Sequence, residues 1–150
     1  MTTHPSVLLV DDDRTTNFLH ERLLRRLKVA KQVVTTTNGV QALAYLASLG
    51  GEAEKPCPSL ILLDLRMSVL DGWGFLAAYR RLPFHQRQAP VIVLVVPPLR
   101  VAELEDLQRL PVASVLYKPL TTEKVEQILA LLPIPDPAIL EKEQPPTSFA

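Results

Sequence analysis

The sequence lacks features that would assign it to several specialised classes of protein. It has a single cysteine, Cys57, so no disulfide can form within the chain, which suits a reducing cytosol. Its 16 basic side chains balance 16 acidic ones, so the net charge indicates neither nucleic acid nor an anionic membrane as a partner. We therefore expect neither of these two kinds of partner.

The chain also lacks long apolar segments. No apolar run approaches the roughly 20 residues that span a bilayer. The first 13 residues have neither the basic start nor the apolar stretch of a signal peptide. We therefore expect a cytoplasmic protein without a membrane segment. With 150 residues, 47% of them hydrophobic, the chain can bury the core of one domain of ordinary size.

Short apolar runs alternate with helical patterns along the chain. Four runs have strand length and are apolar throughout, as are strands covered on both faces of a parallel sheet. These runs are residues 6–10, 59–63, 90–96 and 113–117. A fifth run, residues 31–37, is half polar, as an edge strand would be. Apolar residues at helical spacing lie between the runs, for example Leu19, Leu23 and Leu27. This alternation predicts an α/β layer fold with a parallel sheet.

The last part of the chain differs in composition from the rest. Residues 133–150 are rich in proline and charge, and we expect them to form a flexible tail without a fold of its own. The expected domain therefore covers residues 6–132, with no output domain attached to it.

Charged side chains follow three of the expected strands. Asp11 and Asp12 follow the first strand, Asp64 follows the third, and Lys118 follows the fifth. Ligands of such sheets bind beyond the carboxyl ends of the strands, so these side chains are expected to gather at one edge. Clustered carboxylates suit a hard cation such as Mg2+, which would offset their mutual repulsion. A carboxylate can also act as a nucleophile on phosphorus, and Lys118 and Mg2+ would supply positive charge to the phosphoryl oxygens.

A simpler role for these aspartates is to cap a helix or form a turn, as aspartate often does. Asp13 is expected to be such a cap, because Arg14 and Thr15 enter a helix. For Asp11 and Asp12, the combination with Asp64 and Lys118 favours a functional site.

Three motifs at these strand ends resemble a known family. The motifs are VLLVDDD (residues 7–13), LILLDLRMSVLDGWGFL (residues 60–76) and VLYKPL (residues 115–120). In this order and spacing they resemble the receiver domain of two-component response regulators of the chemotaxis-receiver kind. The resemblance implies a flavodoxin-like, doubly wound α/β fold, with five parallel strands in the order 2-1-3-4-5 and five helices. It also implies a single-domain signalling protein rather than an enzyme.

The resemblance further implies a role for each site residue. Asp64 would accept a phosphoryl group from a sensor histidine kinase or a phosphotransfer protein. Asp11, Asp12, Asp64 and the main-chain carbonyl of Arg66 would hold Mg2+. Lys118 would contact the phosphoryl group, and its bond to Pro119 would be cis. The phosphorylated protein would then bind an unknown downstream protein or pass the phosphate on in a relay.

Two positions depart from the family's pattern. Receivers usually carry Thr or Ser at the end of the fourth strand, where this chain has Val95, and often an aromatic residue where it has Val115. The usual switch pairs that ring with the hydroxyl, so both halves are missing. The lost hydrogen bond to the phosphoryl group would be worth about 1.5–3 kcal/mol. Tyr117 is expected to be a poor substitute for the ring. It lies next to Lys118, and its side chain is expected to point to the opposite face of the strand.

Two other functions are compatible with the sequence. One is a pseudo-receiver, which binds proteins without ever taking phosphate and is favoured by the two valines. The other is a haloacid dehalogenase-like phosphatase, whose signature matches LLVDDDRT, with Asp11 as nucleophile and Asp13 as acid and base. Against the phosphatase, Val95 occupies its hydroxyl position and Asp64 precedes Lys118, which is the wrong order.

Overall fold

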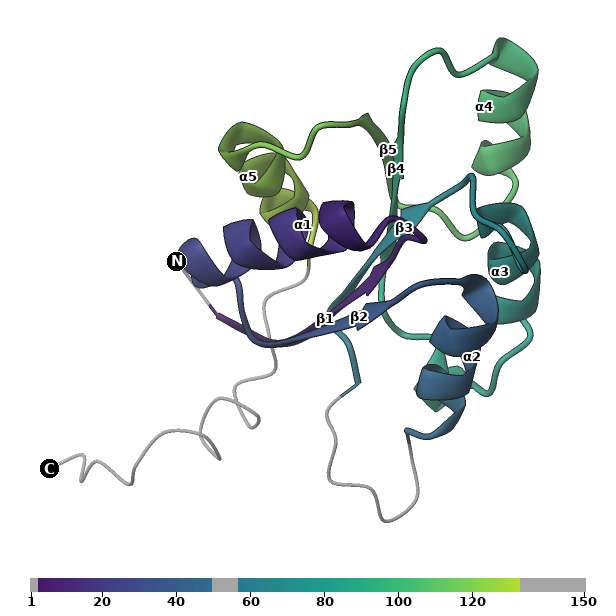
Figure 1. Ribbon diagram of the computed structural model, residues 1–150. Helices are drawn as coiled ribbons and strands as arrows, with labels where there is room; N and C mark the ends of the chain where they lie inside the picture. Colours follow the sequence, from purple (N-terminus) through teal and green to yellow (C-terminus); the bar gives the residue numbers. More distant parts are fainter. Residues whose placement is uncertain (1–2, 50–56, 133–150) are drawn as a thin grey trace, which may run out of the picture.

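The computed structural model describes residues 3–49 and 57–132, which form a five-stranded parallel sheet with helices on both faces (Figure 1). The strands are β1 (His4–Val10), β2 (Ala30–Thr36), β3 (Leu60–Asp64), β4 (Val91–Val95) and β5 (Ser114–Tyr117). The helices are α1 (Arg14–Arg26), α2 (Gly39–Ala47), α3 (Gly72–Tyr79), α4 (Val101–Gln108) and α5 (Thr122–Leu131), and a 3-10 turn, η1 (Phe84–Gln86), precedes β4. The strand order β2-β1-β3-β4-β5 confirms the predicted fold.

Every predicted strand segment overlaps an observed strand. The first strand begins at His4 rather than at Ser6, and the last helix ends at Leu131. The predicted tail, residues 133–150, lies outside the described residues. Among the helices that are described, none combines the length and the hydropathy that crossing a bilayer would require.

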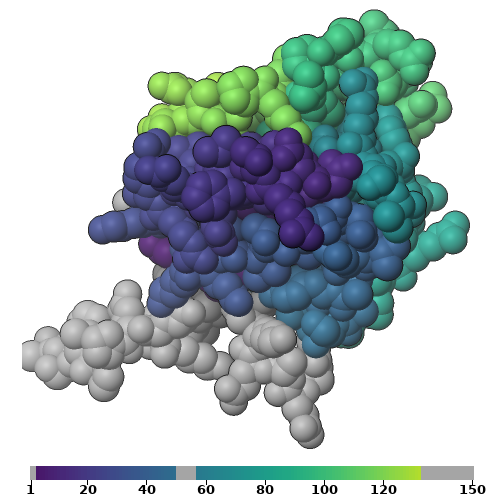
Figure 2. Space-filling model, in the orientation of Figure 1, coloured from purple at the N-terminus to yellow at the C-terminus, as the bar shows by residue number. Residues whose placement is uncertain are grey.

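The sheet separates two hydrophobic cores. Successive side chains of a strand point to opposite faces, so Leu8 and Val93 pack with α2 and α3, whereas Leu9 and Leu94 pack with α1 and α5. Figure 1 shows α1 and α5 on one side of the sheet and α2, α3 and α4 on the other, and Figure 2 shows α5 lying directly beside α1. The three central strands are buried along their whole length, as their continuous apolar runs predict.

The two edge strands differ from the central ones. β2 contains both buried and exposed residues, as its half-polar sequence predicts for an edge strand. β5 forms the opposite edge and is only partly buried, so the expectation of full coverage was wrong for this run. An edge strand has a neighbouring strand on one side only, and an apolar run alone does not reveal this position.

Capping side chains begin the two helices that start beside the carboxyl ends of β1 and β3. Asp13 caps α1, since its Oδ1 accepts hydrogen bonds from the backbone N–H groups of Thr15 at 2.9 Å and Thr16 at 3.3 Å. This confirms the role expected for Asp13. Asp71 caps α3 by accepting a bond from the Gly74 N–H at 2.9 Å. Such caps satisfy N–H groups that have no partner within the helix.

Gly72 allows α3 to start directly against the end of β3. A Cβ at this position would lie 2.7 Å from the Leu65 Cα and 2.8 Å from the Asp64 carbonyl oxygen. The Gly72 N–H also donates to the Leu65 carbonyl oxygen at 2.9 Å. Because the crowding atoms belong to the backbone, they cannot turn aside as a flexible side chain could. This packing therefore holds the backbone that carries Asp64.

Candidate functional site

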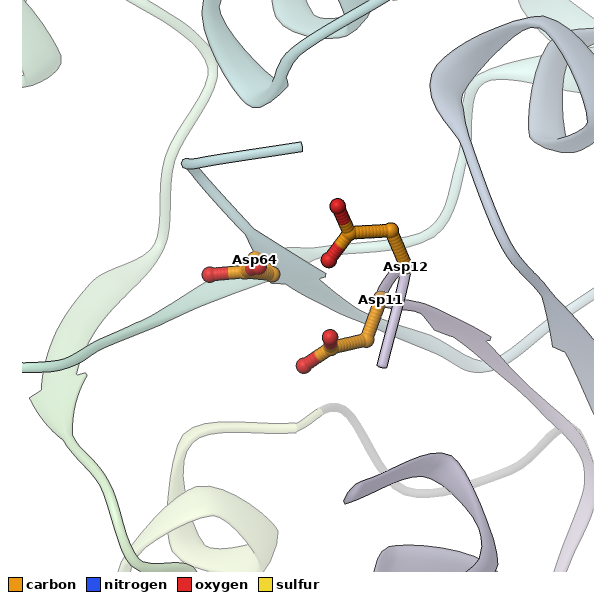
Figure 3. Close-up of side chains that lie close together, drawn as sticks. All are labelled: Asp11, Asp12 and Asp64. Carbon is orange, nitrogen blue, oxygen red and sulfur yellow. The ribbon is translucent and has the colours of Figure 1, made fainter. Parts of the chain in front are cut away.

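Three aspartates come together at the carboxyl edge of the sheet. β1 pairs with β3 so that Val10 lies opposite Leu63, which places Asp11 and Asp64 on neighbouring strand ends. Figure 3 shows Asp11 and Asp12 at the end of β1 and Asp64 close by at the end of β3. Each offers one carboxylate oxygen, and these oxygens lie within 4.8 Å of one another. Asp11 is 4% exposed and Asp64 is 9% exposed, whereas Asp12 is exposed to solvent.

Lys118 brings a positive charge to the two buried carboxylates. Its Nζ lies 2.7 Å from Asp11 Oδ2 and 3.5 Å from Asp64 Oδ1. The backbone N–H of Lys118 donates to the Val95 carbonyl oxygen at 2.8 Å, so the backbone pairing with β4 continues one residue beyond β5. The Lys118–Pro119 bond is cis, as the resemblance implied. The four side chains expected at this edge are therefore all present there.

The comparisons with known proteins agree with this geometry. Residues 7–130 match the family model of the response regulator receiver domain. The chain belongs to this family. Its members are signalling proteins, and the expected fold and family are both confirmed.

Individual relatives show how far the similarity extends. Response regulator Rcp1 of Synechocystis sp. is 33% identical over 88 residues, which are 59% of this chain and 59% of Rcp1, so the match spans less than two thirds of that protein. A probable chemotaxis protein CheY of Rhizobium etli is 32% identical over 120 residues, 80% of this chain and 85% of that protein. The crystal structure of a two-component response regulator from Cytophaga hutchinsonii has a TM-score of 0.75 at 24% identity, covering 86% of this chain and 96% of that one.

Burial raises the pKa of the Asp64 carboxyl in this receiver domain above its ordinary value. The Lys118 ammonium opposes this rise, while the charge of Asp11 adds to it. The Arg66 backbone N–H lowers the pKa of Asp64, and the charge of Asp12 raises it. Three carboxylates thus share one ammonium, and the edge of the sheet carries an excess of negative charge. Asp11, Asp12 and Asp64 are residues that could hold a divalent cation.

Asn17 is a supporting residue that the sequence reasoning missed. It is 4% exposed, and its Nδ2 donates to the Asp11 carbonyl oxygen at 2.8 Å and to the Thr36 carbonyl oxygen at 3.1 Å. The side chain therefore ties α1 to the ends of β1 and β2. The Ser68 N–H donates to Asp12 Oδ2 at 3.3 Å and links Asp12 to the loop after β3. A polar residue in the first turn of a helix that follows the acidic run was the available signal for Asn17.

Val95 and Val115 lie on the face of the sheet that α2, α3 and α4 cover. Val95 is 1% exposed and belongs to the core on that face, and Val115 packs against this core. Tyr117 is paired with Val95 in the register of β4 and β5. It follows Val115 by two residues and so shares its face, whereas Leu116 and Lys118 have the opposite parity. The parity expected for Tyr117 was therefore wrong, and Tyr117, which is 46% exposed, lies beside Val95 in the register of the two strands.

The position of Asp13 argues against the phosphatase interpretation. Its carboxylate caps α1, and its N–H donates to Asp11 Oδ1 at 2.9 Å. The Asp13 carboxylate is thus committed to the helix end and is not available as an acid or base for Asp11. Together with membership of the receiver family, this removes the phosphatase alternative.

A groove of about 550 Å³ lies beside Lys118, between α1 and the segment that leads into α5. Its lining is partly apolar, with arginines along α1. The lining residues are Thr16, Leu19, His20, Arg22, Leu23, Arg26, Lys118, Pro119 and Leu120. The surface beside Lys118 is thus both apolar and basic.

The raised pKa of Asp64 predicts that this residue destabilises the metal-free protein at neutral pH. The unfolded chain ionises near the ordinary value of 3.8, before the folded protein does, so stability falls as the pH rises through the raised pKa. Asp64→Asn should therefore be more stable than the wild type at pH 7 in the presence of a chelator. This advantage should shrink as the pH falls toward 3.8. Urea unfolding at several pH values measures it.

Asp13→Asn is the matched control for that measurement. Hydrogen bonds from Thr16 and then Thr15 lower the pKa of Asp13, which is the opposite direction. An ionised Asp13 therefore contributes stability above its ordinary pKa, and Asp13→Asn should not become more stable at pH 7. Equal stability of Asp64→Asn and wild type across the pH range would contradict the account of Asp64.

Proposed function

We propose that Asp64 accepts a phosphoryl group from the phosphohistidine of a sensor kinase or a phosphotransfer protein. The observation that carries this proposal is the meeting of buried Asp64 with Asp11, Asp12 and Lys118 at one edge of the sheet. The receiver family to which the chain belongs supports it. The reaction would take place in the cytoplasm, and the phosphorylated protein would bind a downstream protein or pass the phosphate on.

Mg2+ fits the donor set of this site. Hard carboxylate oxygens are the ligands that Mg2+ takes, and the three aspartates offer oxygens within 4.8 Å of one another. Asp11, Asp12, Asp64 and the main-chain carbonyl of Arg66 would hold the ion. When bound, Mg2+ supplies positive charge to the phosphoryl oxygens and offsets the excess of negative charge in the site.

Asp64 and Lys118 have separate roles in the proposed transfer. A carboxylate oxygen of Asp64 attacks phosphorus, so that a P–O bond forms while the P–N bond to the kinase histidine breaks and the imidazole leaves. Lys118 is placed to contact the transferred group, because its Nζ lies 3.5 Å from Asp64 Oδ1. Its shorter contact with Asp11, at 2.7 Å, would keep the ammonium in position during the transfer. Lys118 also favours the ionised form of Asp64, which is the form that attacks.

The surface around α1 supports docking of the phosphate donor. Phe18 is 60% exposed and Leu19 is 54% exposed on this helix, which begins next to the acidic residues. The groove beside Lys118 continues this surface toward the site. A donor domain seated there would bring its histidine to the carboxyl edge of the sheet.

A second candidate is a pseudo-receiver, a protein-binding module that does not take phosphate. Val95 and Val115 favour it, because neither side chain can take part in the usual switch between a hydroxyl and a ring. Asp64, Asp12 and Lys118 are all present, however, and these supply the nucleophile, a metal ligand and the cation. The two candidates differ in whether Asp64 is ever phosphorylated.

Mg2+ should stabilise the folded protein by mass action. A ligand at a hundredfold excess over its Kd stabilises the folded state by about 2.7 kcal/mol. The melting temperature should therefore rise with millimolar Mg2+, and Asp12→Ala should reduce this rise. Asp13→Ala is the control, since it removes a neighbouring acidic cap and should leave the rise intact. A melting temperature of the wild type that does not respond to Mg2+ would count against the metal site.

Phosphorylation of Asp64 can be tested with a small-molecule donor. After incubation with acetyl phosphate and Mg2+, the intact mass of the wild type should increase by one phosphoryl group. Asp64→Asn should show no increase, because the amide cannot form the acyl phosphate. If Asp64→Asn is labelled as well as the wild type and Asp11→Asn is not, Asp11 is the acceptor and the proposal fails. Absence of labelling in the wild type would favour the pseudo-receiver.

Val95→Thr tests whether the missing hydroxyl at the end of the fourth strand weakens binding of the phosphoryl group. Restoring a hydroxyl should strengthen binding of beryllofluoride, a phosphoryl mimic, by up to about tenfold, if the bond is worth about 1.4 kcal/mol. Without the mimic the variant should be neutral or slightly less stable, because a buried hydroxyl costs free energy unless it is paired. Titration in the presence of Mg2+, followed by Trp73 fluorescence, measures the affinity.

Val93→Thr is the matched control, since Val93 lies on the same face of β4 and is fully buried two residues farther from the site. It should carry the same cost in stability without the gain in affinity. Equal affinities of Val95→Thr and wild type would mean that the side chain at position 95 does not face the phosphoryl group.

A further inference from the structure

Arg66 links the loop after β3 to the region after β4. Its Nη2 lies 3.3 Å from the Pro98 carbonyl oxygen and 3.9 Å from Glu103 Oε1 in the first turn of α4. The arginine comes two residues after Asp64, and Pro98 comes three residues after Val95. The guanidinium therefore joins the strand end that carries the proposed phosphoacceptor to the strand end that lacks the hydroxyl.

Glu103 is the centre of the contacts at the N-terminus of α4. Its Oε1 accepts hydrogen bonds from the Arg100 N–H and from the Arg100 Nε, both at 3.2 Å. Arg100 occupies the N-cap position, and an arginine side chain has no acceptor with which to cap a helix. The start of α4 thus depends on Glu103, and Arg66 adds the tie from Glu103 to the loop after β3.

The present contacts of Arg66 are weak. Its side chain is 56% exposed and the ion pair with Glu103 is long, at 3.9 Å. Exposed ion pairs contribute between about 0 and 1 kcal/mol. A guanidinium that can bind phosphoryl oxygens through two parallel hydrogen bonds makes a stronger interaction than this.

The charge of a phosphorylated site would favour a movement of the Arg66 guanidinium toward the phosphoryl group. A phosphoryl group carries a charge of about −1.5 to −2 at neutral pH. Together with Asp11 and Asp12 it would exceed the positive charge of Mg2+ and Lys118 by up to one unit. Val95 provides no hydroxyl to share this charge, whereas Arg66 carries one positive charge and lies two residues along the chain from Asp64.

We propose that Arg66 binds the phosphoryl group on Asp64 and, in doing so, leaves Pro98 and Glu103, so that phosphorylation loosens the start of α4. This inference rests on the proposed phosphorylation of Asp64. Arg66 thereby takes over the role of the missing hydroxyl, and its change of partner replaces the switch between hydroxyl and ring. The segment affected carries exposed apolar side chains, with Val101 72% and Leu104 39% exposed. A change there alters a surface that a downstream protein can contact.

Two measurements on one set of variants test this role. Titration with beryllofluoride and Mg2+, followed by Trp73 fluorescence, gives the affinity for the phosphoryl mimic. Hydrogen exchange of the backbone amides of residues 99–104 reports on the start of α4. The variants are Arg66→Ala and, as a matched control, Arg100→Ala, which also removes a guanidinium from Glu103 but lies outside the loop that follows Asp64. Both side chains are mostly exposed, so both variants should fold, which circular dichroism checks.

The wild type should show faster exchange of residues 99–104 when the mimic binds. Arg66→Ala should bind the mimic about tenfold more weakly, as expected for the loss of a hydrogen bond to a charged group. Its amides should exchange fast without the mimic and should not change when the mimic is added. Arg100→Ala should bind the mimic with the affinity of the wild type.

Wild-type affinity in Arg66→Ala would overturn the proposal, and so would an exchange rate in the wild type that does not respond to the mimic. These results leave the phosphorylation of Asp64 intact, because the mimic still binds. Failure of the wild type itself to bind the mimic would instead overturn the proposed function, and the role of Arg66 with it.

Discussion

The contact of the Lys118 ammonium with Asp11, at 2.7 Å, and with Asp64, at 3.5 Å, is the interaction on which the site depends. Buried carboxylates are costly unless they are paired, and Asp11 and Asp64 are both almost fully buried. Lys118 reaches these two carboxylates from the far side of β4. It follows the last residue of β5, and its backbone N–H still pairs with the Val95 carbonyl oxygen of β4. A single ammonium thus balances only part of the negative charge of the three carboxylates, and the site retains an excess of negative charge.

Much of the fold could be predicted from the sequence because its strands are buried and therefore continuously apolar. The position of Asp64 followed from the same pattern, since parallel strands end at one edge and the charged residue is the first one after the apolar run. Asn17 and the contacts of Arg66 could not be predicted in this way. Both depend on contacts between segments that are distant in the sequence, namely α1 with the end of β2 for Asn17 and the loop after β3 with the region after β4 for Arg66, and no periodic pattern records such contacts. The partial burial of β5 depends likewise on its place at the edge of the sheet.

We expect the two valines to change the chemistry of the proposed site less than they change its means of signalling. Val95 and Val115 belong to or pack against the core on the face that α4 covers, so apolar side chains stand where the family's usual pattern leads us to expect a hydroxyl and an aromatic ring. The proposed role of Arg66 would allow signalling despite the two valines, because a charged side chain would respond to a phosphoryl group without a rearrangement of the core. Signalling would then be electrostatic and would act on the exposed start of α4.

The proposed function depends on which residue carries the phosphoryl group. Sodium borohydride reduces an aspartyl phosphate to homoserine and leaves free carboxylates unchanged, so peptide mass spectrometry after this treatment locates the acceptor. For protein incubated with acetyl phosphate and Mg2+, we expect homoserine at position 64 and unchanged aspartate at positions 11, 12 and 13. Homoserine at Asp11, or no conversion at any aspartate, would contradict it.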